Sequence, residues 1–151
     1  MFLEREDVNP NQPDTRNGET PLVWAAKDGC VGVVKTLLER NDVNPNQPDT
    51  LFGRTPFMWA AKSGHVEVVK ILLGREDVNP DYADTKSSET PLSWAAGHGY
   101  EDVVKMLLKR KDVNPNLPDP KNDETRLVSA AKNGHVGVVK SWRHDQTVSL
   151  N

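Results

Sequence analysis

The stretch TPLVWAAKDGCVGVVKTLL, residues 20–38, returns three more times along the chain. The copies begin at Thr55, Thr90 and Thr125, so the spacing is a constant 35 residues. Self-similarity at such a period is typical of stacked supersecondary units, none of which can bury its own apolar face alone. We therefore expect both the core and the functional surface of this chain to extend across neighbouring repeats.

Each copy opens with the signals of a helix start. The threonine hydroxyl can accept a hydrogen bond from an amide of the first turn, and a proline follows it in all copies but the fourth, which has Arg126. Next come an Ala-Ala pair and a glycine, which permits the left-handed turn that ends many helices. The four glycines are Gly29, Gly64, Gly99 and Gly134. These features predict a short inner helix in every repeat.

A second helix is predicted directly after each glycine. In the first copy Val31, Val34, Leu37 and Leu38 recur at helical spacing and give one apolar face. Between the repeats lie segments such as DVNPNQPDT, residues 42–50, whose prolines and Asx residues disfavour helix and favour extended chain with turns. Each linker is therefore predicted to project as a loop or hairpin.

This order of motifs resembles the ankyrin-repeat family, whose pattern contains Thr-Pro-Leu-His, Ala-Ala, Gly-His, Val-Val-x-x-Leu-Leu and Asp-Val-Asn. The resemblance covers nearly the whole chain and implies an all-α solenoid of helix-turn-helix units joined by hairpin-like loops. Two family positions depart from the pattern. The histidine of the first motif is replaced by Val23, Met58, Ser93 and Val128. The turn histidine is kept as His65 and His135 and becomes Cys30 and Tyr100 elsewhere.

We expect one ankyrin-repeat domain over residues 1–151. Its predicted parts are an N-terminal remnant at 1–14, repeats at 15–49, 50–84, 85–119 and 120–145, and a tail at 146–151. Arg143 stands where earlier repeats have leucine, which indicates a C-terminal cap. At the other end, only Phe2 and Leu3 are available to cover the first repeat. Any self-association of an otherwise monomeric chain is therefore expected there.

Composition limits the function classes. The 151 residues are 36% hydrophobic with a net charge of -3, and no apolar run approaches the ~20 residues of a membrane helix. We expect an intracellular protein, cytoplasmic or nuclear, without a membrane partner or a specific nucleic-acid signal. A single cysteine excludes an internal disulfide.

The tryptophans and histidines are interpreted as structural. Trp24, Trp59 and Trp94 precede the Ala-Ala pairs and are predicted to lie buried between repeats, whereas Trp142 should matter less to stability. His65 and His135 lie two repeats apart, too far to share a metal ion, and should tie helix turns by hydrogen bonds. No metal and no cofactor is predicted.

A mixed polar row lies at the inner-helix ends, formed by Asp28, Ser63, His98 and Asn133. Its members should stand roughly 10 Å apart at the backbone, which is too far for a nucleophile and its base. An alternative hypothesis, a small-molecule binder or cyclase-like enzyme, would use a pocket near Phe52, Ser63, Tyr82 and His98.

The resemblance implies that hairpin tips and inner-helix ends face a concave binding side. The predicted tips are Arg16-Asn17, Leu51-Phe52, Lys86-Ser87 and Lys121-Asn122, followed by Glu19, Arg54, Glu89 and Glu124. A basic line at the inner-helix ends contains Lys27, Lys62 and Lys132 and is interrupted by Gly97. Only Leu51-Phe52 is an apolar tip, which predicts either a binding hot spot or a side chain folded onto its own loop. Glu19, Arg54 and Glu89 could equally bridge adjacent loops.

These observations favour a non-enzymatic scaffold that binds another protein or a peptide on its concave side. Stacked repeats present their tips at fixed spacing, so little conformational entropy is lost on association. The enzyme or small-molecule alternative stays open at this stage, as does a structural fragment without a binding function of its own.

Overall fold

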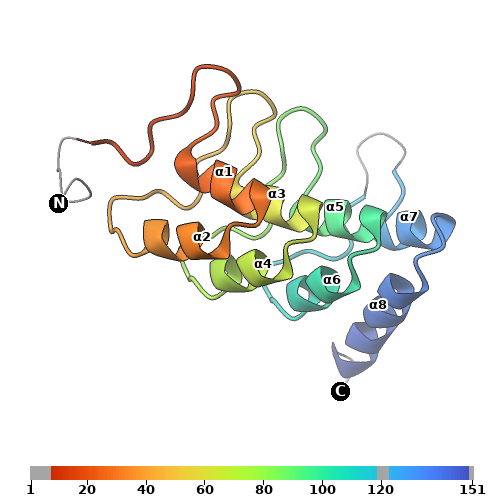
Figure 1. Cartoon of the computed structure of the whole chain (residues 1–151). Coiled ribbons are helices and arrows are strands. Elements are labelled where there is room, and N and C mark those ends of the chain that lie inside the picture. The colour runs from red at the N-terminus through yellow and green to blue at the C-terminus, as the bar shows by residue number, and fades with distance from the viewer. Residues whose placement is uncertain (1–7, 119–122, 150–151) are drawn as a thin grey trace.

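The computed structural model describes residues 8–118 and 123–149, with side chains described up to Trp142. In this part of the chain eight helices form two layers (Figure 1). The inner layer contains α1 (Pro21–Asp28), α3 (Pro56–Ser63), α5 (Pro91–His98) and α7 (Arg126–Lys132). The outer layer contains α2 (Val31–Leu38), α4 (Val66–Leu73), α6 (Glu101–Leu108) and α8 (Val136–Ser149). We refer to the four helix pairs, each with its preceding loop, as repeats one to four.

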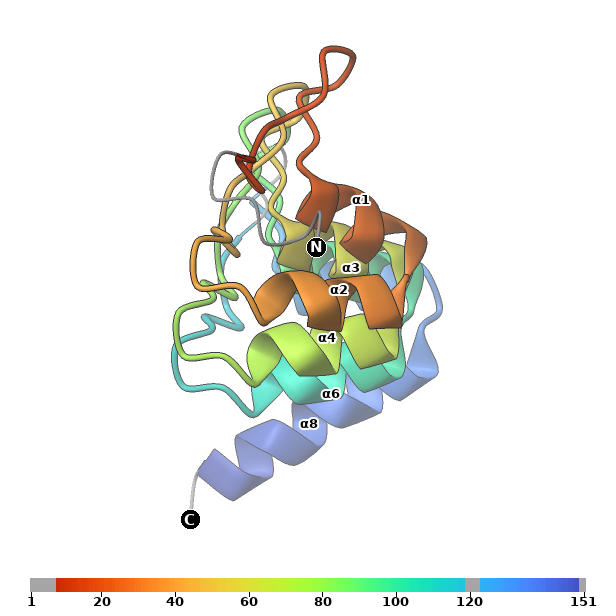
Figure 2. The same ribbon diagram turned by 60° about the vertical axis from the view of Figure 1, so that its left-hand side comes forward.

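The prediction of an all-α helix-turn-helix solenoid is confirmed. The described residues contain no strand, only an isolated antiparallel bridge between Pro118 and Thr125. The connecting loops project together from one side of the stack, as Figure 2 shows. The described part of the chain does not include residues 1–7, residues 119–122 or the Arg143 side chain. The predicted N-terminal remnant, C-terminal cap and fourth hairpin tip depend on these residues. Helix α8 continues to Ser149, past residue 145, where repeat four was expected to end.

Helix starts and ends lie where the sequence predicted them. Thr55 accepts a hydrogen bond from the Met58 amide at 3.2 Å, and the other three threonines make the equivalent bond. In repeat three Ser93 replaces the motif histidine and completes a capping box, because its hydroxyl accepts from the Thr90 amide at 2.8 Å. Gly29, Gly64 and Gly99 end the inner helices in the left-handed conformation.

The apolar core runs between the two layers. Its members include Leu22, Phe57 and Leu92 from the inner helices and Val69 and Leu107 from the outer ones. Trp142 takes the place that leucine holds in the earlier outer helices and is only 1% exposed. The expectation that Trp142 matters less than the other tryptophans is therefore wrong, since the last outer helix uses the largest side chain available to close the core.

The turn histidines connect successive repeats. The His65 Nε2–H donates to the Lys27 carbonyl at 2.9 Å, and His135 makes the same bond to the Gly97 carbonyl. Each ring lies over the turn glycine of the preceding repeat, and a Cβ on Gly29 would fall 2.7 Å from the His65 ring. The histidine tie predicted within the turn is thus made across the repeat junction.

Asparagine side chains connect the loops in the same direction. Asn11 donates its amide to the Asp42 carbonyl at 2.7 Å and accepts from the Asn44 amide at 2.7 Å. Asn46 repeats both bonds one repeat further along. The Asx residues of the linkers thus hold neighbouring loops in register.

Candidate functional site

The three inner-helix tryptophans differ in exposure. Trp59 is buried as predicted, at 8% exposure, whereas Trp24 is 45% exposed and Trp94 is half-buried, so the prediction of buried indoles is wrong for these two. The cover of Trp59 comes from the loop of its own repeat. Phe52 packs edge-on against Trp59 with 6.0 Å between ring centroids, and the Arg54 guanidinium lies 5.0 Å from the Trp59 ring. Repeat one has polar Asn17 and acidic Glu19 at those positions, which leaves Trp24 open.

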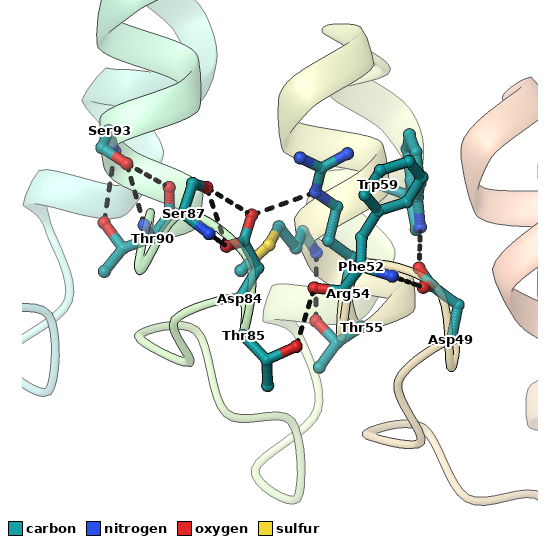
Figure 3. Close-up of polar contacts among 11 residues, drawn as sticks. Asp49, Phe52, Arg54, Thr55, Trp59, Asp84, Thr85, Ser87, Thr90 and Ser93 are labelled. Atoms are coloured by element: carbon teal, nitrogen blue, oxygen red, sulfur yellow. Dashed lines mark hydrogen bonds and ion pairs between the residues drawn. The ribbon is translucent and has the colours of Figure 1, made fainter.

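An aspartate anchors the first two indoles to their loops. Trp59 donates its indole N–H to Asp49 at 2.7 Å, and the same carboxylate accepts from the Phe52 amide at 2.6 Å (Figure 3). Trp24 makes the equivalent bond to Asp14 at 3.0 Å. This bond and the Asn17 amide lower the pKa of Asp14 to about 2. Sequence reasoning missed these aspartates, although a constant separation of 10 residues from the tryptophan was a visible signal.

Repeat three breaks this pattern. Asp84 accepts from Arg54 Nε at 3.0 Å and from the Ser87 hydroxyl and amide, as Figure 3 shows. Burial raises the pKa of Asp84, but the bonds from Ser87 and Arg54 outweigh it and the net shift is downward. The Trp94 indole N–H is consequently buried without a hydrogen-bond partner. Arg54 therefore bridges the loops of repeats two and three, one of the two roles considered for it.

Cations and indoles alternate along the inner layer. Lys27 Nζ lies 5.3 Å from the Trp24 ring and 4.8 Å from the Trp59 ring. Lys62 Nζ lies 5.9 Å from Trp59 and 4.4 Å from Trp94. Cation–π attraction of this kind holds each lysine in the gap between consecutive indoles. We call the surface formed by these side chains together with Leu51, Phe52 and Arg54 the inner-helix surface.

Most charges on this surface are paired. Lys27 binds Glu19 at 2.8 Å, Arg126 binds Glu89 at 3.3 Å and Lys132 binds Glu124. Lys62 forms no ion pair with any residue in the described part of the chain. Burial and the neighbouring charge of Arg54 lower the pKa of the Lys62 ammonium.

The predicted binding residues differ widely in exposure. Seven are exposed: Arg16, Asp28, Leu51, Lys86, His98, Lys132 and Asn133. Seven are half-buried: Asn17, Lys27, Phe52, Lys62, Ser63, Ser87 and Glu89. Glu19 and Arg54 are buried by their ion pairs. At the apolar tip, Leu51 remains 42% exposed whereas Phe52 folds onto Trp59, so the two residues do not form a single exposed anchor.

A pocket of about 170 Å³ opens between α5 and α7. It is lined by Glu89, Ser93, Trp94, Gly97, His98, Arg126 and Ser129. Gly97 replaces the lysine of the other repeats, and a Cβ there would meet open space. The His98 ring stacks on Tyr100 and its Nδ1–H donates to the Trp94 carbonyl at 2.8 Å. Phe52, Ser63 and Tyr82 do not line this pocket, so the structure does not bring them to His98 there as the enzyme alternative predicted.

Comparison with known proteins identifies the family. The family model described as ankyrin repeats (3 copies) matches residues 1–84, 33–119 and 76–141. The chain therefore belongs to the ankyrin-repeat family, whose members are generally non-enzymatic protein–protein interaction modules. A search of the curated proteins found no match. Within the described residues, no helix has the length and apolar character needed to cross a membrane.

Proposed function

We propose that the chain binds a segment of a partner protein on the inner-helix surface of repeats two and three. The observation that carries this proposal is the row of partly covered indoles and cations, which ends at the open pocket beside Gly97. Aromatic side chains and arginine are enriched in the centres of protein interfaces. Here the side chains stand on short helices whose loops are bonded to one another, so few of them need ordering on association.

The partner segment would extend from Leu51 across Trp59 and Trp94 to Gly97. Leu51 offers an exposed apolar side chain at one end, and the pocket can receive a partner side chain at the other. Repeat one is less suited, because it has Lys27, bound to Glu19 at 2.8 Å, where repeat three has Gly97. Of the residues predicted from sequence, we keep Leu51, Lys62 and His98 as direct contacts and treat Phe52, Arg54 and Ser87 as their supports.

We further propose that the protein acts inside the cell, that it has no catalytic activity, and that it is a monomer. Any self-association would use the N-terminal end, where Val33 is 52% exposed although its equivalents Val68 and Val103 are buried. An exposed valine at the end of the stack supports that choice, since a neighbouring molecule could cover it.

A pair of glycine substitutions tests the proposed surface. Gly97→Lys would restore the Glu-Lys arrangement of repeat one and fill the pocket, while adding up to about 1 kcal/mol of helix propensity. We expect it to keep the fold and lose the partner in a quantitative pull-down from the source cell, with thermal unfolding measured in parallel. Gly32→Lys is the matched control, because Gly32 is also helical and open but lies on the outer layer. Equal capture by the wild type and Gly97→Lys would place the binding site elsewhere.

A further inference from the structure

The charges of the inner-helix surface change in the two central repeats. Eight residues separate Glu19 from Lys27 in repeat one and Glu124 from Lys132 in repeat four, and both pairs form ion pairs. In repeat two the glutamate is replaced by Arg54, and in repeat three the lysine is replaced by Gly97. The central repeats therefore lack the internal ion pair of the outer ones.

The replacement by Arg54 leaves Lys62 without a counter-charge among the described residues. Arg54 holds the position at which repeats one and four have the glutamate that pairs with the lysine. It is a cation and binds Asp84 at 3.0 Å. Glu89, which lost its own lysine, binds Arg126 of the next repeat instead. Lys62 is half-buried between the Trp59 and Trp94 rings, which supply cation–π contacts and no negative charge.

We infer that Lys62 is the receptor for a carboxylate side chain, aspartate or glutamate, of the bound protein segment. This inference rests on the proposed function and names the chemistry of the partner at that site. A carboxylate above Lys62 would restore the pairing that the outer repeats make internally. The two indoles half-bury the Lys62 side chain, and an ion pair is stronger where the local dielectric is lower than that of water.

The surroundings favour a single carboxylate over a polyanion. Glu89 lines the pocket next to this site, and the chain carries a net charge of -3. Both would repel an extended row of phosphates, such as a nucleic acid. The exposed Leu51 on one side and the pocket beside Gly97 on the other indicate apolar or small side chains flanking the acidic one.

A selection from a random library of about 12-residue peptides tests the inference. We expect the folded wild-type chain to enrich peptides with aspartate or glutamate at one position. Lys62→Gln should weaken the best of these peptides at least tenfold, while Lys132→Gln should not, because Lys132 is exposed and already paired. Replacing the acidic peptide residue by its amide should cost the same factor with the wild type and nothing with Lys62→Gln, as a double-mutant cycle would show. Circular dichroism verifies that each variant is folded.

The outcomes separate this inference from the proposed function. Two outcomes would overturn the carboxylate assignment while leaving the proposed binding surface in place. In the first, the selected peptides lose binding with Gly97→Lys but carry no acidic position. In the second, the acidic peptide residue and Lys62 contribute independently to binding. A selection that yields no peptide sensitive to Gly97→Lys would contradict both.

Discussion

Among single residues, Asp81 interrupts the ladder of asparagines between loops. Asn11 and Asn46 each donate to a carbonyl of the next loop and accept from its backbone amide. Asp81 holds the same position but, as a carboxylate, can only accept, and it does so from the Asn114 amide at 3.3 Å. Its other oxygen is buried without a partner, and burial, followed by the Asp112 charge, raises the pKa of the carboxyl.

Asp81→Asn should therefore stabilise the protein. The amide would add the missing donor to the Asp112 carbonyl and remove a half-buried charge, which is expected to contribute about 1 kcal/mol. Because the folded-state pKa of Asp81 is raised, its ionisation costs stability at neutral pH, and the cost disappears as the pH falls through that pKa. The gain measured by urea unfolding should be full at pH 7 and shrink toward pH 3. Asn46→Asp, the reverse change one repeat earlier, should destabilise; a gain from both substitutions would refute the ladder argument.

At the scale of elements, the turn between inner and outer helix joins consecutive repeats. Gly29 has φ 72° and lies under the His65 ring, which itself is bonded to the Lys27 carbonyl. A side chain at Gly29 would meet both backbone strain and the imidazole of the next repeat. The glycine that ends one inner helix thus also provides the contact surface for the histidine of the next repeat.

Gly29→Ala should cost about 2 kcal/mol, because a left-handed alanine is unfavourable and its methyl group would displace His65. Gly32→Ala, three residues later in α2, has open space and ordinary helical geometry and should instead gain about 0.5 kcal/mol. Chemical denaturation of the two variants compares them directly. Similar effects from both would mean that the repeat junction does not depend on the close approach at Gly29.

On the scale of the whole molecule, the first and last repeats expose apolar side chains that the central repeats cover. Val33 is exposed at the first repeat, and at the last repeat Val128 and Val136 are exposed where the equivalents in repeat two, Met58 and Val66, are buried or half-buried. Among the described residues, nothing lies within 4 Å of the Cβ position of Gly134, whereas the three preceding turn glycines are each covered by a ring. In this part of the chain, the central repeats therefore pack against a repeat on either side, whereas the apolar side chains of the first and last repeats are less covered.

Hydrogen exchange should follow this difference. In a stack stabilised by nearest-neighbour contacts, we expect amides of α1, α2, α7 and α8 to open at lower free energy than those of α3 to α6. Native-state exchange measured by NMR at several urea concentrations resolves the helices individually. Uniform protection along the stack would show that the chain unfolds as one unit and that the exposed ends are not weak points.

Sequence determined the fold of this protein because its signals are local. The threonine caps, the glycine turns and the apolar spacing act within one repeat, and a 35-residue period repeats them at Thr20, Thr55, Thr90 and Thr125.

Only the tertiary structure decided which side chains form the candidate site. The cover of Trp59 and Trp94 depends on Arg54, and Asp84 accepts a hydrogen bond from the same arginine, 30 residues earlier in the chain. The contacts of Arg54 with Trp94 and Asp84 join different repeats, whereas the repeated pattern describes each repeat separately. Lys62 looks like Lys27 and Lys132 in the sequence, and it differs from them because no carboxylate of the described residues pairs with it.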